Sequence, residues 1–392
     1  MNILLETIEI LTKGLMDFTI PQAIMMLIGA GLMYLGIKKE YEPTLLVPMG
    51  LGTILVNFPS SGIITQLDPQ TGESIEGIFN LLFDAGISTE LFPLLIFIGI
   101  GAMIDFGPLL QNPFMMLFGA AAQLGIFLTV IVAVALSVTG ILPDSLTFTL
   151  KEAASVGIIA AADGPTSIFV ADRLAPSLLA PITVAAYSYM ALVPIIQPPV
   201  IKALTSKKER QIHMKYEPKS VSKTAKILFP LVITMVAGFV APLSLPLIGF
   251  LMFGNLLREC GVLDSLSNTA QNELVNIVGI LLGITVSTKM TADEFLNVKT
   301  LLIIAFGLLG FVFDTAGGVL FGKFLNLFRK EKINPMIGAA GISAFPMSSR
   351  VIQKMATDED PKNFILMHAA GANVSGQIAS VVAGGLLLAF FM

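Results

Sequence analysis

The sequence is short of charged residues, cysteine and histidine. Only 13% of its 392 residues are Asp, Glu, Lys or Arg, whereas soluble domains carry about 25%, so a soluble fold could not cover its surface with them. The single cysteine, Cys260, excludes an internal disulfide, and His213 and His368 have no carboxylate or cysteine at ligand spacing, so no zinc or iron site is indicated. The basic residues do not interleave with aromatic residues, so nucleic acid is not an expected partner.

Apolar residues make up 55% of the chain and form long uninterrupted runs. Several runs contain no charged residue and exceed the ~20 apolar residues that a helix needs to cross the hydrocarbon core of a bilayer. These runs are Phe106 to Pro143, Leu174 to Ile201, Ile227 to Leu257 and Phe364 to Met392. The pattern predicts an all-α polytopic protein embedded in membrane lipid.

Polar segments divide the chain into four parts. Residues 1–19 place charges on one side of a helix, which predicts an amphipathic interfacial helix or, alternatively, a helix that docks a partner. Residues 20–203 and 225–392 form a first and a second transmembrane part. Residues 204–224 between them are rich in lysine, so the positive-inside rule places this linker in the cytoplasm, either as a tether or as a docking surface for a soluble partner.

The two transmembrane parts show the same order of features. In each, a glycine-containing segment precedes a long apolar run, and a segment broken by proline and hydroxyl residues follows, at Pro165 in the first part and Pro346 in the second. Their identity is weak, which leaves chance similarity of apolar segments as the alternative. If each copy crosses the membrane an odd number of times, the fold contains two inverted repeats, with broken or re-entrant helices meeting at the bilayer midplane.

Asp163 lies inside the first broken segment, in the run AADGPTSIF, with no basic residue close in sequence. A charged residue at membrane depth costs about 2.5 to 3.5 kcal/mol on insertion scales. Pro165 disfavours helix at the residue before it, so backbone carbonyls beside the acid are freed. Together with the hydroxyls of Thr166 and Ser167, these groups are the oxygen ligands that a small cation prefers. The alternative is a buried aspartate that only caps the helix starting at Thr166.

The second transmembrane part supplies matching groups in the runs INPMIGAAGISAFPMSSR and GANVSGQIAS. Asn334 and Ser343 offer neutral oxygens, and Asn373 lies between glycines that permit close helix approach, although packing alone would also explain that run. Arg350 is the only cation in this neighbourhood, and an unpaired arginine at membrane depth is costly as well. It either pairs with Asp163 or holds the carboxylate of an anionic substrate through its forked guanidinium.

With these motifs the chain resembles the beta subunit of the sodium-pumping biotin-dependent decarboxylases, which act on oxaloacetate, methylmalonyl-CoA, glutaconyl-CoA or malonate. The resemblance covers essentially the whole chain and rests, in this order, on AADGPTSIF, GNLLRECGV, SNTAQNEL, INPMIGAAGISAFPMSSRV and HAAGANVSGQIAS. By motif, the functional residues of the family fall on Asp163, Tyr189, Asn334, Ser343, Arg350 and Asn373. A second tyrosine, Tyr187, stands two positions before Tyr189.

The resemblance implies an enzyme, a carboxybiotin decarboxylase that couples release of carbon dioxide to Na+ export. In that role Asp163, Asn373 and Ser343 bind Na+, and Arg350 and Asn334 bind carboxybiotin. Arg350, Asp163 and Tyr189 are then the catalytic residues, with Tyr189 as the proton donor.

The resemblance also implies partners and a location. The resemblance places the biotin on another subunit, and the run TKM at Thr288 to Met290 is too short to count as an attachment site in this chain. The expected partners are a biotin carrier subunit, a carboxyltransferase alpha subunit and a small membrane gamma or delta subunit, in the inner (cytoplasmic) membrane of a prokaryote; homo-oligomerisation stays open. The alternative function is a Na+-coupled secondary transporter of a carboxylate, which would require the same repeats, acid and arginine. Such a transporter would be active when this chain is reconstituted alone.

Overall fold

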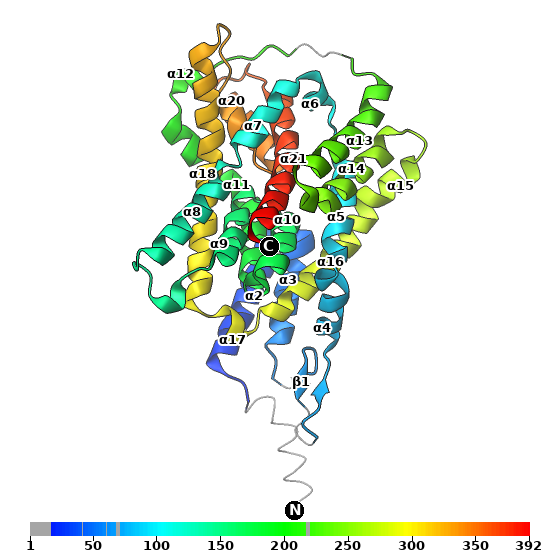
Figure 1. Cartoon of the computed structure of the whole chain (residues 1–392), viewed down its shortest axis with the longest axis vertical. Coiled ribbons are helices and arrows are strands. Elements are labelled where there is room, and N and C mark those ends of the chain that lie inside the picture. Colours follow the sequence, from blue (N-terminus) through cyan, green and yellow to red (C-terminus); the bar gives the residue numbers. More distant parts are fainter. Residues whose placement is uncertain (1–16, 41, 60, 68–70, 217–219) are drawn as a thin grey trace, which may run out of the picture. The chain divides into compact units, whose positions relative to one another are not determined.

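The computed structural model describes residues 17–40, 42–59, 61–67, 71–216 and 220–392 (Figure 1). These residues are mostly helical, and they contain one two-stranded antiparallel hairpin. Six helices are long and apolar enough to cross a membrane, or up to eight if each of two bent helix pairs is one span. The predicted all-α polytopic membrane class is therefore confirmed. The amphipathic helix predicted for residues 1–19 lies almost wholly outside the described residues.

The chain divides into two compact units. The first comprises Met1–Phe92 and Asn276–Thr300, and the second comprises Pro93–Val275 and Leu301–Met392. Three helices have residues in both units, namely α5 (Leu91–Met103), α16 (Val275–Val286) and α18 (Val298–Phe328).

The first unit is built around two helices that pack through glycine. Helix α2 begins in a capping box, in which Thr19 and Gln22 each accept a hydrogen bond from the other's backbone N–H. A Cβ on Gly29 of α2 would lie 2.6 Å from the carbonyl oxygen of Gly50 of α3, so the two backbones touch and only glycine fits. The other elements of the unit are short. In chain order the unit contains α2 (Ile20–Lys39), α3 (Pro43–Val56), β1 (Gln66–Leu67), β2 (Ser74–Ile75), α4 (Ile78–Phe83), the π-helix η1 (Asp84–Ser88), η8 (Ser287–Lys289) and α17 (Ala292–Phe295).

The second unit holds most of the apolar helices and both proline-broken segments. Its first elements are α6 (Gly107–Gln111), η2 (Pro113–Met115), α7 (Met116–Ala121), α8 (Leu124–Val138), η3 (Asp144–Leu146), α9 (Leu150–Gly157), η4 (Ile158–Ala161), α10 (Gly164–Leu174), η5 (Pro176–Leu178), α11 (Leu179–Leu204) and α12 (Lys207–Arg210). They are followed by α13 (Lys223–Val240), η6 (Pro242–Ser244), α14 (Leu245–Glu259), α15 (Asp264–Thr269), the π-helix η7 (Ala270–Leu274), α19 (Met336–Ala339), α20 (Met347–Glu359) and α21 (Leu366–Phe391).

Helix α21 is the centre of this unit. It packs against α6, α7, α10 and α20, and it is drawn in red among them in Figure 1. Small residues permit this packing, since a Cβ on Gly384 would lie 2.8 Å from a methyl group of Thr166 in α10. One face of α21 is therefore presented to both broken segments.

The order of elements recurs along the chain. The series α4, η1 and α5, with its π-helical turn, is followed later by α15, η7 and α16, which also contains a π-helical turn. In the first case the long apolar helix α8 and the broken segment between α9 and α10 follow. In the second case the long apolar helix α18 and the broken segment between α19 and α20 follow. This recurrence agrees with the predicted repeat, whereas the inverted relation of the two halves stays a prediction.

Candidate functional site

The first broken segment ends in a left-handed turn just before Asp163. Helix α9 starts at a capping box formed by Thr149 and Glu152, tightens into the 3-10 turn η4 and stops at Ala162, whose φ is 50°. Asp163 is extended, and α10 begins at Gly164, with Pro165 in its first turn. The predicted break is thus present, and it leaves the acid at the start of a new helix.

The second broken segment meets the first one directly. Helix α19 ends at Ala339, α20 begins at Met347, and the residues between them form turns. The backbone N–H of Ser343 in this segment donates to the carbonyl oxygen of Ala161, at 3.1 Å. The two breaks predicted at Pro165 and Pro346 therefore lie side by side.

Four donors surround the carboxylate of Asp163. The backbone N–H of Thr166 donates to Oδ1 at 3.3 Å, which makes Asp163 the cap of α10. Oδ2 accepts from the hydroxyls of Thr166, Ser343 and Ser380 at 2.8, 3.0 and 2.7 Å. The residue is only 3% exposed, so its charge is shielded from water and held by groups from both breaks and from α21.

Helix α21 adds amide oxygens that have no hydrogen-bond donor. Asn373 donates through Nδ2 to the carbonyl of Ile342 at 2.8 Å, and Gln377 donates to the carbonyl of Ser343. Their oxygens, Asn373 Oδ1 and Gln377 Oε1, are buried without a partner in the described structure. Buried acceptors are nearly always satisfied, so these two oxygens mark a place for a cation or a donor.

The charge of Asp163 has no basic partner, since no ion pair to it forms within the described part of the chain. A buried carboxylate must be balanced by a cation or a proton. Hydroxyl, carboxylate and amide oxygens are the ligands of hard cations. No cluster of three or more His, Cys, Asp or Glu side chains occurs among the described residues. The negative charge of one carboxylate equals the charge of one monovalent cation or one proton.

Tyr189 lies apart from this cluster. Its hydroxyl donates to the carbonyl of Ile304 in α18, and its ring stacks on Phe311 with centroids 6.4 Å apart. The ring of Tyr187 instead lies against Gly164, where an added Cβ would collide with it. Of the two tyrosines, Tyr187 is therefore the one that touches the residue beside Asp163.

Arg350 is not paired with Asp163. Its side chain is exposed on α20, and it makes no ion pair or side-chain hydrogen bond in the described structure. The structure thus leaves its guanidinium available for an anion. This agrees with the interpretation that Arg350 holds the carboxylate of an anionic substrate.

Asn334 is not part of the Asp163 cluster either. It donates to the carbonyls of Arg210 and Ile212 at 2.8 and 3.1 Å, and its oxygen accepts from the backbone of Met336. Asn363 donates to the same two carbonyls. The linker expected to be a tether or docking surface is therefore itself held by amide side chains from elsewhere in the second unit.

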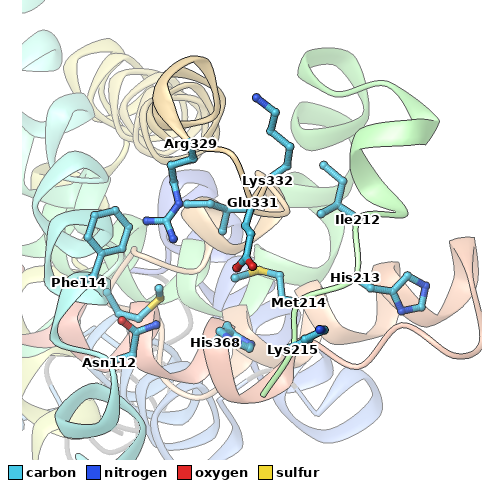
Figure 2. Close-up of a pocket in the computed structure, with 12 residues that line it drawn as sticks. Asn112, Phe114, Ile212, His213, Met214, Lys215, Arg329, Glu331, Lys332 and His368 are labelled. Carbon is cyan, nitrogen blue, oxygen red and sulfur yellow. The ribbon is translucent and has the colours of Figure 1, made fainter. Parts of the chain in front are cut away.

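The bound linker forms one wall of a cavity of 610 Å³. Figure 2 shows Arg329, Glu331 and His368 around this space, with His213 turned away from it. Arg329 lies over the ring of Phe114, 5.0 Å from its centroid, and forms no ion pair in the described structure. His368 belongs to α21, so Asn373 follows it by about 7.5 Å along that helix at 1.5 Å per residue. The cavity thus lies beside the linker, at the end of α21 that carries His368. The same helix carries Ser380, which donates to Asp163.

Two residues of the Asp163 cluster were not predicted. Ser380 binds Asp163 directly, and Gln377 places its amide next to Ser343. Gln377 follows Asn373 by four residues and Ser380 follows it by seven, and this spacing puts all three on one face of a helix. That spacing is a signal in the sequence from which both could have been identified.

Comparison with known proteins shows similarity over the whole chain. A family model described as the beta subunit of Na+-transporting oxaloacetate decarboxylase matches residues 21–391. The chain is 47% identical to methylmalonyl-CoA decarboxylase subunit beta of Propionigenium modestum over 395 residues, 97% of each chain. It is 48% identical to the subunit of that name from Veillonella parvula over 377 residues, 96% of this chain and 95% of that protein. It is also 45% identical to an oxaloacetate decarboxylase beta chain of Salmonella typhimurium over 425 residues, 97% of each chain.

Proposed function

Because the chain belongs to the family of Na+-transporting decarboxylase beta subunits, the membrane subunits of sodium pumps, we propose that it decarboxylates carboxybiotin and couples this step to Na+ export through Asp163. The observation that carries the proposal is the Asp163 cluster. Within the described residues, the buried carboxylate has no basic partner, and it lies with hydroxyls from both breaks and with amide oxygens of α21 that accept no hydrogen bond. Such an arrangement suits a desolvated monovalent cation.

The reaction itself requires little covalent chemistry from the protein. The bond between the carboxylate carbon and the ureido nitrogen of biotin breaks, its electron pair stays on nitrogen, and nitrogen takes up one proton as carbon dioxide leaves. Removing the carboxylate from water favours this collapse to a neutral product. A proton donor must reach the nitrogen.

Carboxybiotin enters from the linker side in this proposal. The support is the cavity beside residues 212–215, which offers Arg329 and Lys215 to an anion and lies at the end of α21. Asn334 acts here by holding the linker wall in place. Arg350 binds the carboxylate, in agreement with its guanidinium, which forms no ion pair with any residue that the structure describes. Tyr189 donates the proton, for which its hydroxyl has to leave the carbonyl of Ile304.

The partners and location follow from the same proposal. The chain works with a biotin carrier subunit, a carboxyltransferase alpha subunit and a small membrane gamma or delta subunit in the inner membrane of a bacterium. The support is that its relatives are named as beta subunits and come from bacteria. The linker, with its excess of lysine, faces the cytoplasm, where a soluble carrier would arrive.

Replacing Asp163 by asparagine tests the proposal. Asparagine caps helices as well as aspartate does, so α10 stays capped and the complex stays assembled, whereas the charge that balances the cation is lost. We expect Na+-dependent decarboxylation of free carboxybiotin and Na+ uptake by proteoliposomes to be lost together.

Asp144→Asn is the matched control, because Asp144 is exposed at the start of the short 3-10 helix η3 and its side chain makes no hydrogen bond in the described structure. It should keep both activities. Full activity of Asp163→Asn, with assembly checked by gel filtration, would show that Asp163 is only a cap.

A further inference from the structure

One histidine borders two neighbouring cavities at the linker end of α21. His368 lines the cavity of 610 Å³ and also a second cavity of 410 Å³. The two cavities have Asn112, Met115, Lys215 and Glu331 in common as well, so they adjoin each other. Both volumes lie within the range of about 300–1,000 Å³ that is typical of sites for small organic ligands. A ligand that extends from one cavity into the other would pass the imidazole of His368.

The imidazole of His368 is held in place by the linker and by α6. The residue is only 8% exposed. The ring of Tyr216 meets it edge to face, with centroids 5.9 Å apart and ring planes at 83°. The hydroxyl of Tyr216 in turn donates to Oε1 of Gln111 at 2.7 Å, and the backbone of Lys215 forms a hydrogen bond with the imidazole. The ring is therefore fixed at the border of the two cavities.

His368 keeps a hydrogen-bonding group that the described protein does not use. Its Nδ1 is buried without a partner in the described structure. A neutral imidazole has one N–H donor and one acceptor nitrogen, and buried polar atoms of side chains are mostly paired. A ring that only packed against Tyr216 would need neither nitrogen. The unused capacity of the imidazole indicates a ligand with a polar, neutral group.

The charges of the larger cavity favour an anion. Arg329 and Lys215 line it, against a single acid, Glu331 (Figure 2). Lys332 lines it too, but its Nζ donates to the carbonyl of Asn326. Neither Arg329 nor Lys215 forms an ion pair within the described residues. The cavity thus offers cations for a carboxylate and, at His368, a group for a neutral polar part of the same ligand.

We propose that His368 binds the ureido group of carboxybiotin as it arrives in this cavity, before the carboxylate reaches Arg350. The inference rests on the proposed function and adds a substrate-binding residue to it. The ureido group presents a carbonyl oxygen and, on the nitrogen that is not carboxylated, an N–H, so an imidazole can pair with it. Arg329 and Lys215 attract the carboxylate at this stage. The chain that tethers biotin to its carrier then lies in the smaller cavity.

His368→Phe in the complete complex tests this assignment. Phenylalanine keeps an aromatic ring against Tyr216 but removes both ring nitrogens. The measurements are decarboxylation of free carboxybiotin and its inhibition by biotin amide, which carries the ureido group without the carboxylate. We expect the KM for carboxybiotin and the inhibition constant of biotin amide each to rise about tenfold, the equivalent of ~1.4 kcal/mol, whereas kcat should change little.

Two other variants separate the ureido group from the carboxylate. Lys215→Gln removes a cation, so it should raise the KM for carboxybiotin and leave the inhibition constant of biotin amide unchanged. His213→Gln is the control for loss of a histidine, because His213 turns away from the cavity toward Asp360, to which glutamine can still donate (Figure 2). It should leave both constants unchanged.

An unchanged inhibition constant of biotin amide in His368→Phe overturns the assignment, because His368 then only packs. A raised constant accompanied by faster trypsin cleavage of the linker lysines overturns it as well, since displacement of the linker would explain the loss. His368→Leu takes the place of the phenylalanine variant if that one fails to assemble, with the same expected and contradicting results. The proposed function fails separately, if the unmodified complex does not decarboxylate free carboxybiotin.

Discussion

Asp163 shows how one residue combines a structural and a functional role. Its Oδ1 accepts from the helix that it caps, while Oδ2 collects three hydroxyls. A cap alone needs only the first of these bonds. The additional hydroxyls come from three different elements, and their convergence at one oxygen is the feature that a cap does not explain.

Ser380 offers a direct test of that convergence. Its hydroxyl donates to Asp163 at 2.7 Å and lies 3.0 Å from the hydroxyl of Ser343. A hydrogen bond to a charged group contributes about 1.5–3 kcal/mol. If the serine oxygen is also a ligand, Ser380→Ala should raise the Na+ concentration needed for half-maximal decarboxylation roughly tenfold or more.

The matched control for this variant is Ser375→Ala. Ser375 is buried on the same helix, but its hydroxyl donates to the carbonyls of Met115 and Ala372, away from Asp163. It should leave the Na+ requirement unchanged. If both variants need the same Na+ concentration for half-maximal decarboxylation, Ser380 contributes only to packing.

The residues of the site were predictable to different degrees. Asp163 and Ser343 follow from local chemistry, because a charge in an apolar run and a proline break are visible in the sequence. Arg350 could not be assigned, since its pairing depends on which way α20 faces.

At the scale of elements, the linker is held in place by specific polar contacts. Arg210 donates through Nε to Glu359 at 2.7 Å and through Nη1 to the carbonyl of Thr205 at 2.6 Å. Both partners of the ion pair are largely buried, with 12% and 15% of their side chains exposed. Composition predicted the position and charge of the linker, but not its docking, because docking depends on partners more than 100 residues away.

Glu359→Gln should loosen this docking. The glutamine can still accept a hydrogen bond, but the pair loses its charge, at a cost of about 1–2 kcal/mol for a partly buried pair. Because each 1.4 kcal/mol is a factor of ten, trypsin should cleave the linker lysines roughly tenfold faster in membranes. Asp358→Asn is the control, since Asp358 is exposed and makes no interaction in the described structure. Identical cleavage rates for the two variants would contradict a role of the ion pair in holding the linker.

The helices themselves were largely predictable, and their meeting points were not. The uncharged apolar run from Phe364 to Met392 contains α21 (Leu366–Phe391), because apolar length is a local property. The contact between Ser343 and Ala161 joins segments 182 positions apart, and only weak repeat similarity suggested it. Tertiary packing thus supplies the information that places the two breaks together.

For the whole molecule, the decisive property is dependence on a biotinylated partner. A pump subunit takes its free energy from carboxybiotin delivered by a carrier, whereas a secondary transporter carries its substrate alone. Proteoliposomes with the complete complex should therefore take up Na+ when the acyl substrate is added, and avidin, which occludes biotin, should abolish the uptake. Proteoliposomes with this chain alone should show no substrate-driven uptake, but should show Na+-dependent decarboxylation when free carboxybiotin is supplied. Avidin-insensitive uptake of Na+ together with a carboxylate by the chain alone would instead establish a transporter, because no carrier would then be needed to supply the driving force.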